Sequence, residues 1–149
     1  MAEEIERKWR IDTVVLPDYP LISQHRVEQA YLSVHPEVRI RNQDDQLFTL
    51  TIKGEGDIRR REIELPITGE QYREILTQLI RKEALIKDYR RYRLPGGLVL
   101  ELSNVDNLFC YAEVEFPSLQ AAEDFVPLPF FREEMSLKMK QYWVQKYGE

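Results

Sequence analysis

Ionised side chains that alternate with apolar ones are the residues of this chain best suited to chemistry. Successive side chains of a β-strand point to opposite faces, so Glu4, Glu6 and Lys8 share one face of a predicted strand. On other predicted strands the same parity gathers Arg39, Arg41, Lys53, Arg60, Glu62, Glu64, Glu101, Glu113 and Glu115. Lysine and arginine bind oxyanions, and clustered glutamates bind hard divalent cations. Brought together in one cavity, these side chains would suit a complex of a metal ion with a polyphosphate.

The elements that must position these residues are short strands. Period-two alternation or a β-rich composition marks the segments 3–11, 26–34, 37–42, 46–53, 59–66, 85–94, 97–103 and 109–116. A glycine-containing turn at 54–57 makes a hairpin of the fourth and fifth segments, and Pro95-Gly96-Gly97 joins the sixth to the seventh. Most strands are therefore expected to pair antiparallel with a sequence neighbour.

Two or three helices are expected to interrupt the strands. Thr68 and Gln71 form a capping box ahead of an apolar helical stripe that runs to Ile80. A short helix is expected over 118–125, and Ser136 could begin a terminal one. The predicted class is α+β, dominated by strands, in a single domain over residues 1–149.

The direction of the charged faces has two interpretations. Antiparallel sheets commonly leave one face in water, and an ionised solvent face is the ordinary outcome. In the alternative, the sheet curls until it is closed or nearly closed, and the charged faces line its interior. The amphipathic helices favour this second arrangement, because they must bury their apolar stripes against the outside of the sheet.

Composition excludes several classes of protein. The chain has 149 residues and a formal net charge of −5, which makes it a poor general binder of nucleic acid or membranes. It has no long apolar run and no signal-peptide pattern, and Cys110 is its single cysteine, so a cytoplasmic protein is expected. The motifs of zinc proteases, P-loop proteins and α/β-hydrolases are absent.

A set of ordered motifs resembles the CYTH superfamily, the triphosphate tunnel metalloenzymes. Glu4-Ile5-Glu6-Arg7-Lys8 is similar to the family's ExExK signature. The motifs that follow it are Gln29-Ala30-Tyr31-Leu32, Val38-Arg39-Ile40-Arg41, Leu50-Thr51-Ile52-Lys53, Arg60-Arg61-Glu62-Ile63-Glu64 and Ala112-Glu113-Val114-Glu115-Phe116. The resemblance covers nearly the whole chain and is closest to the bacterial inorganic triphosphatases. It implies an eight-stranded antiparallel β-tunnel with helices packed outside.

The resemblance also implies the roles of individual residues. Those that would hold phosphate oxygens are Lys8, Arg39, Arg41, Lys53, Arg60, Lys87 and Arg91. Those that would gather Mg²⁺ or Mn²⁺ are Glu4, Glu6, Glu62, Glu64, Glu101, Glu113 and Glu115. Tyr31 would set the position of the Lys8 ammonium, and Lys8, Glu4, Glu6 and Tyr31 would form the catalytic group. The expected activity is metal-dependent hydrolysis of a triphosphate, with inorganic tripolyphosphate preferred over a nucleoside triphosphate.

Two departures from the family pattern leave alternatives open. In Lys87-Asp88-Tyr89-Arg90-Arg91-Tyr92, either a bulge shifts the register or Tyr89 stands where an arginine is expected. Ser103 stands where the family has an aspartate. An adenylate cyclase of class IV type, a thiamine triphosphatase or a non-catalytic polyphosphate-binding module would share this fold. A small-molecule triphosphate is the expected partner, nucleic acid and membrane are not required, and a homodimer is an open alternative.

Overall fold

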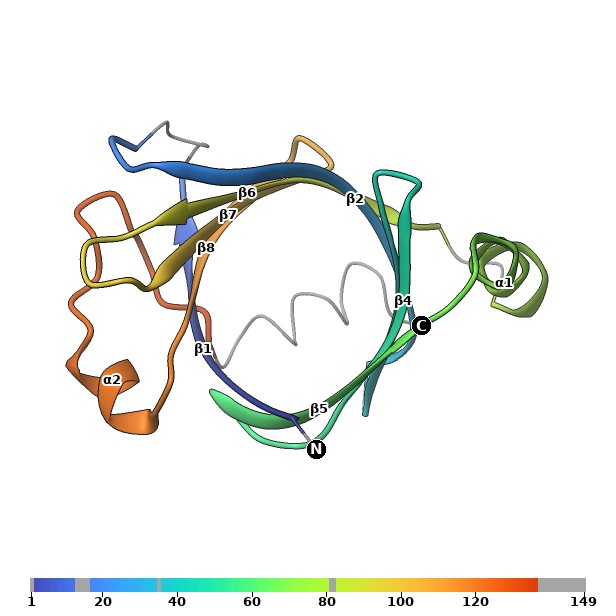
Figure 1. Ribbon diagram of the computed structural model, residues 1–149, viewed down its shortest axis with the longest axis horizontal. Helices are drawn as coiled ribbons and strands as arrows, with labels where there is room; N and C mark the ends of the chain where they lie inside the picture. The colour runs from blue at the N-terminus through green and yellow to red at the C-terminus, as the bar shows by residue number, and fades with distance from the viewer. Residues whose placement is uncertain (1, 13–16, 35, 81–82, 137–149) are drawn as a thin grey trace.

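Eight antiparallel strands close into a barrel in the computed structural model, which describes residues 2–12, 17–34, 36–80 and 83–136 (Figure 1). The strands are β1 (Ala2–Ile11), β2 (Leu21–Val34), β3 (Glu37–Gln43), β4 (Leu47–Lys53), β5 (Arg59–Pro66), β6 (Leu85–Arg93), β7 (Val99–Val105) and β8 (Phe109–Glu115). Their order around the barrel is β1-β5-β4-β3-β2-β6-β7-β8, with β8 pairing back onto β1. The predicted strands and the closed sheet are confirmed.

Tight turns join most of the sequence neighbours. Asp44 and Asp45 link β3 to β4 with φ values of 56° and 55°, and Asp106 and Asn107 link β7 to β8 with 54° and 58°. Each pair of left-handed residues begins a three-residue loop, since Gln43 pairs with Leu47 and Val105 with Phe109, and aspartate and asparagine tolerate that conformation. The β4–β5 and β6–β7 hairpins also form as predicted.

Strand β1 changes partners half-way along its length. Ala2 to Ile5 pair with β5, whereas Glu6 to Ile11 pair with β8. Beyond the short β5 pairing, residues 132–136 lie beside β1: the Arg132 amide donates to the Arg10 carbonyl at 2.8 Å, and the Met135 amide to the Lys8 carbonyl at 2.7 Å. This segment therefore satisfies an edge of β1 that β5 does not reach. The predicted terminal helix lies outside the described residues.

The first helical segment covers one side of the barrel. Helix α1 (Gly69–Glu74) continues into one wider, π-helical turn, η1 (Ile75–Leu79). The capping box is present: the Thr68 hydroxyl accepts from the Gln71 amide at 3.0 Å, and the Gln71 side chain accepts from the Thr68 amide at 2.9 Å. Tyr72 is fully buried and packs with Ala30 and Ile40 on the outer face of the sheet.

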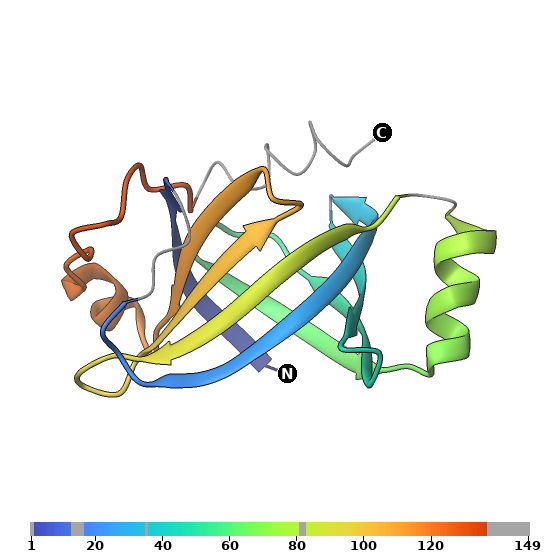
Figure 2. The ribbon, with the colours of Figure 1, turned by 90° about the horizontal axis from the view of Figure 1, so that it is seen from above.

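The second helix covers the opposite side (Figure 2). Helix α2 (Leu119–Asp124) and the loop that follows it pack onto Trp9, whose ring stacks on Phe131 at 4.7 Å and lies 5.6 Å from Phe125. The outward side chains of β1, β7 and β8 complete this core. Both helices thus bury the apolar outside of the sheet, as predicted. No helix in the described part of the chain is long and apolar enough to cross a membrane.

Candidate functional site: the charged lumen

The ionised faces of the strands point inward and enclose a cavity of about 470 Å³, here called the lumen. Its charged and phenolic lining comprises Glu4, Glu6, Lys8, Tyr31, Glu37, Arg39, Arg41, Lys53, Glu55, Asp57, Arg60, Glu62, Glu64, Lys87, Tyr89, Glu101, Tyr111, Glu113 and Glu115. The alternating pattern of the strands therefore divides an apolar outer layer from an ionised inner one. Of the predicted site residues, all but Arg91 line the lumen.

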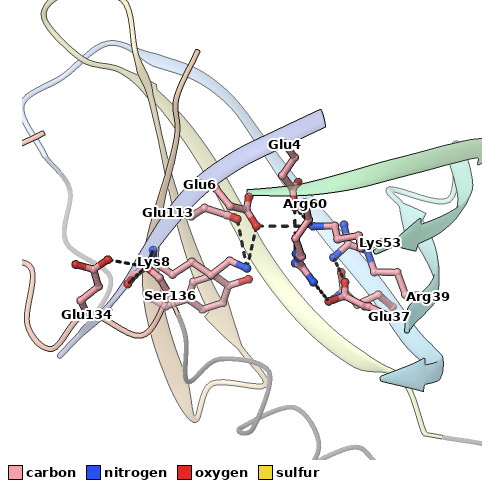
Figure 3. Close-up of polar contacts among 12 residues, drawn as sticks. Glu4, Glu6, Lys8, Glu37, Arg39, Lys53, Arg60, Glu113, Glu134 and Ser136 are labelled. Carbon is pink, nitrogen blue, oxygen red and sulfur yellow. Dashed lines mark hydrogen bonds and ion pairs between the residues drawn. The ribbon is translucent and has the colours of Figure 1, made fainter. Parts of the chain in front are cut away.

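One group of charges centres on the first strand (Figure 3). The Lys53 ammonium lies 2.7 Å from the Glu4 carboxylate and 3.7 Å from that of Glu6. The Lys8 ammonium lies 2.9 Å from Glu6 and 3.8 Å from Glu113. Lys53 is only 3% exposed, so these ion pairs are screened little by water. The strand registers bring the carboxylates and ammonium groups together from β1, β4 and β8.

These buried carboxylates differ in proton affinity. Burial, together with the charge of Glu6, raises the pKa of Glu4 to about 7. Burial acts on Glu6 in the same direction, but the ammonium groups of Lys8 and Lys53 prevail and hold its pKa well below the ordinary value. Burial and the neighbouring charge of Glu6 raise the pKa of Glu113 well above its ordinary value. Like charges so close together indicate that a cation would be bound favourably here.

A second group of charges surrounds Glu37. This carboxylate accepts from Arg60 at 3.2 Å and from Arg39 at 3.3 Å. Burial favours its protonated form, but the charges of Arg39, Lys53 and Arg60 lower its pKa to about 2. Glu37 is not among the site residues predicted from the sequence, although it has the same parity as Arg39. That parity was the signal that could have identified it.

A third group contains two cations that form no ion pair within the described residues, Arg41 and Lys87. The Arg41 guanidinium lies 5.2 Å from the ring centre of Tyr89, and the Lys87 ammonium lies 5.8 Å from the same ring. Lys87 also donates to the Tyr111 hydroxyl at 3.1 Å. Burial and the charges of Arg41 and Arg39 push the pKa of Lys87 well below its ordinary value. An anion bound beside these groups would relieve their mutual repulsion.

The pairing of β6 with β7 decides between the two registers considered for residues 87–92. The register runs without a shift from Lys87 opposite Val105 to Arg93 opposite Val99, so Tyr89 faces the lumen directly and no bulge intervenes. Arg91 follows at one edge, 3.9 Å from Glu101, in a smaller depression that also contains Glu115. Arg91 therefore lies near the lumen but not in its centre.

Tyr31 and Ser103 are both buried on the inner face of the barrel. The Tyr31 hydroxyl accepts from the Gln29 amide group at 3.1 Å, and burial followed by the charge of Glu37 raises its pKa to about 12. This phenol therefore stays protonated near neutral pH. Tyr111, which was also not among the predicted site residues, shares the parity of Glu113 and Glu115 on β8.

The lumen fits a divalent cation in donor type. Glu4 and Glu6 each have one buried carboxylate oxygen, Oε1, whose neighbour is an ammonium group: Lys53 lies 2.7 Å from that of Glu4, and Lys8 lies 2.9 Å from that of Glu6. Within the described part of the chain, however, no three acidic, histidine or cysteine side chains converge closely enough to hold a metal ion by themselves. Mg²⁺ commonly takes one or two carboxylates together with water and substrate phosphates. The donor set therefore matches an ion that arrives with, or is completed by, a phosphate ligand.

Comparison with known proteins agrees with this geometry. A curated inorganic triphosphatase from Nitrosomonas europaea is 35% identical over 142 residues, covering 89% of each chain. A solved structure of an inorganic triphosphatase is 32% identical, with a TM-score of 0.63 over 95% of this chain and 91% of that one. A scan against models of protein families finds no match.

More distant solved structures share the fold alone. A protein from Pyrococcus horikoshii is 20% identical with a TM-score of 0.65, over 96% of this chain and 97% of that one. A Hippeastrum protein described as an adenylyl cyclase with a dominant triphosphatase activity is 16% identical, with a TM-score of 0.53 over 97% of this chain and 88% of that one. The closed barrel, its ionised lumen and the 35% identity to an inorganic triphosphatase agree. The chain therefore belongs to the inorganic triphosphatase branch of the CYTH superfamily of triphosphate tunnel proteins.

Proposed function

We propose that this protein hydrolyses inorganic triphosphate inside the lumen with the help of Mg²⁺ or Mn²⁺. The observation that carries the proposal is the enclosure of interleaved cations and carboxylates in one cavity of about 470 Å³. Buried charges are costly unless they are paired or serve a ligand. A triphosphate with a divalent cation supplies negative charge for the lysines and arginines and positive charge for the glutamates.

The cationic side chains bind and orient the phosphate chain. Among the described residues, the cations that line the lumen are Lys8, Arg39, Arg41, Lys53, Arg60 and Lys87. Their placement on several strands fixes them around the substrate, with Arg91 at the edge. Phosphoryl transfer depends mainly on positioning and on neutralising charge, so no histidine or cysteine nucleophile is needed. Tyr31, protonated and buried beside Arg39, would keep this wall of the lumen in place.

The carboxylates supply the cation site. Glu4, Glu6, Glu113 and Glu115 are the main candidates, with Glu62, Glu64 and Glu101 around them. A bound divalent cation would neutralise phosphate charge and lower the pKa of a bound water. Water adds to the terminal phosphorus, one P–O–P bond breaks, and orthophosphate and pyrophosphate leave. The chain's own contribution is to hold the phosphate in line and to exclude bulk water from the lumen.

Release of orthophosphate from tripolyphosphate tests this proposal. With Mg²⁺ or Mn²⁺ we expect turnover that a chelator abolishes. Parallel assays with ATP and thiamine triphosphate separate the alternatives, because each has a different leaving group on the same triphosphate. Release of cyclic AMP from ATP would indicate a cyclase, and tight tripolyphosphate binding without turnover in any metal would indicate a binding module. No turnover of tripolyphosphate would contradict the proposal.

The lone Cys110 supports a reducing, cytoplasmic location.

A further inference from the structure

We propose that Glu37 is a positioning residue that holds Arg39 and Arg60 in the geometry that receives the triphosphate. The inference rests on the proposed function and adds a residue to it. Glu37 lies at the start of β3 and is 7% exposed. One carboxylate oxygen, Oε1, contacts Arg60 Nη1 at 3.2 Å, and the other, Oε2, contacts Arg39 Nη1 at 3.3 Å (Figure 3).

The two guanidinium groups that Glu37 joins come from strands that do not pair with each other. Arg39 lies on β3 and Arg60 on β5, with β4 between them in the barrel. Glu37 stands directly opposite Lys53 of β4 in the register, but the Lys53 ammonium turns to Glu4 at 2.7 Å. The carboxylate therefore reaches over β4 and links cations whose positions the backbone does not otherwise tie together.

Chemistry argues against a direct catalytic role for Glu37. The cations around it keep it ionised near neutral pH, so it cannot deliver or remove a proton there. The same cations oppose a metal ion at this carboxylate. What remains is orientation: arginine side chains have many rotamers, and fixing them before the ligand arrives reduces the entropy that binding must overcome.

A simpler account treats Glu37 only as a charge that compensates the cations. The two accounts predict opposite changes in affinity when the charge is removed. Losing a nearby negative charge should strengthen anion binding by electrostatics alone. Releasing two guanidinium groups from their fixed geometry should weaken it, by about tenfold or more if one charged hydrogen bond to phosphate is lost.

Calorimetric titration with tripolyphosphate, in a chelator and without added metal, distinguishes the accounts. We expect Glu37→Gln to bind about tenfold more weakly than the unsubstituted protein. Glu3→Gln is the matched control, because Glu3 pairs with Arg59 at 2.9 Å on the outside of the same barrel. That control should bind normally. Unchanged or tighter binding by Glu37→Gln would overturn the inference.

Two further variants keep the test decisive if Glu37→Gln folds poorly. Glu37→Asp retains the charge but shortens the reach, so weaker binding supports positioning and normal binding overturns it. In an Arg60→Lys background, Glu37→Gln should cost less than it does alone, whereas full additivity would contradict action through Arg60. The readout is binding, so an unsubstituted protein that binds but does not hydrolyse tripolyphosphate would refute the proposed function and still test Glu37. Absence of metal-free binding by the unsubstituted protein would overturn the role of Glu37, whereas the proposed function is decided separately by turnover with Mg²⁺ or Mn²⁺.

Discussion

Glu3 and Glu4 are consecutive carboxylates on one strand, and each is paired with a cation, yet they belong to two different environments. Glu3 faces outward and lies 2.9 Å from Arg59, with 41% of its side chain exposed. Glu4 faces the lumen and lies 2.7 Å from Lys53, with 12% of its side chain exposed. The distances are nearly equal, so the difference between the two pairs is one of burial.

That difference separates a surface ion pair from a functional one. Exposed pairs gain little, because water and salt screen them and both side chains lose freedom. Buried pairs lose hydration, and apolar replacements of similar volume are often as stable. A cluster of buried charges is therefore poorly explained by stability. Its retention on the inner face of the barrel is explained by a ligand that needs both signs of charge.

Replacing Lys53 should give the largest effect. Lys53→Met keeps an unbranched side chain that is one atom shorter but removes a cation that we assign to the phosphate chain, and it leaves Glu4 without its nearest partner. We expect kcat/KM for tripolyphosphate to fall on the order of 100- to 1000-fold, as for the loss of one preorganised donor to a developing charge. Steady-state kinetics measures this fall in kcat/KM, after circular dichroism has verified that the variant is folded. Near-normal activity would show that the inner pairs do not differ in function from the outer ones.

The pH dependence of stability should show the next effect, through Glu4. Its pKa of about 7 in the folded protein lies above the ordinary 4.5, so the folded state keeps a proton that the unfolded state has lost. The stabilising contribution of Glu4 should therefore be fully present below pH 4.5 and decline as the pH rises to about 7, by up to about 3 kcal/mol, whereas the contributions of Glu6 and Glu37, whose pKa values are lowered, are lost only at acid pH. Glu113 and Glu115 act in the same direction.

Glu4→Gln isolates the contribution of Glu4, because the amide does not titrate. Chemical denaturation at pH 5 and pH 8 should show a smaller loss of stability in this variant than in the unsubstituted protein. Glu3→Gln is the outward-facing comparison and should leave the pH dependence as it was. An equal decline in all three proteins would show that the inner carboxylate is not held in its protonated form by burial.

Outside the barrel, removing the helix cap should lower stability without touching the site. Thr68→Ala deletes the hydroxyl that accepts from the Gln71 amide, and we expect a loss of about 1 kcal/mol in the free energy of unfolding. Activity at temperatures well below the melting transition should be unchanged. A large loss of activity would mean that the outer helix and the lumen are coupled.

The smallest effect is expected at the outer ion pair itself. Arg59→Met removes the partner of Glu3, which is more than one-third exposed, and should change the free energy of unfolding by less than about 1 kcal/mol. The kcat/KM value should stay within about twofold of normal. Arg59→Met is the matched control for Lys53→Met, because each variant puts methionine in place of a cation that pairs with a glutamate of β1.

Much of the fold could be predicted because the pattern and the helices impose one solution. Alternation gives each strand an apolar face and a charged face. Because the apolar stripe of α1 must pack on the apolar face from outside, the charged face points into the barrel. The long pairing of β2 with β6 was not predicted in full. Residues 21–25 are two apolar residues followed by Ser23, Gln24 and His25, a run without alternation, and they become a strand because they pair with β6, far along the chain.

The site was predicted where the parity of a strand settles the direction of a side chain, and less well elsewhere. Arg10 shares the parity of Lys8 but lies at the end of its strand, where it pairs with Asp12 at 2.8 Å instead of lining the lumen. Glu37 was not predicted because the contact that gives it a role in the site is made with Arg60, on a strand that does not pair with its own. Parity states which face a side chain takes, but not which distant side chain it meets there.

A crystal structure with tripolyphosphate and Mg²⁺ tests the central claim most directly. We expect the phosphate chain inside the barrel, with its oxygens against Lys8, Arg39 and Lys53 and the cation on the carboxylate side. Density for the phosphate chain on the outer surface, for instance at Arg59, with the lumen holding only water, would contradict the account.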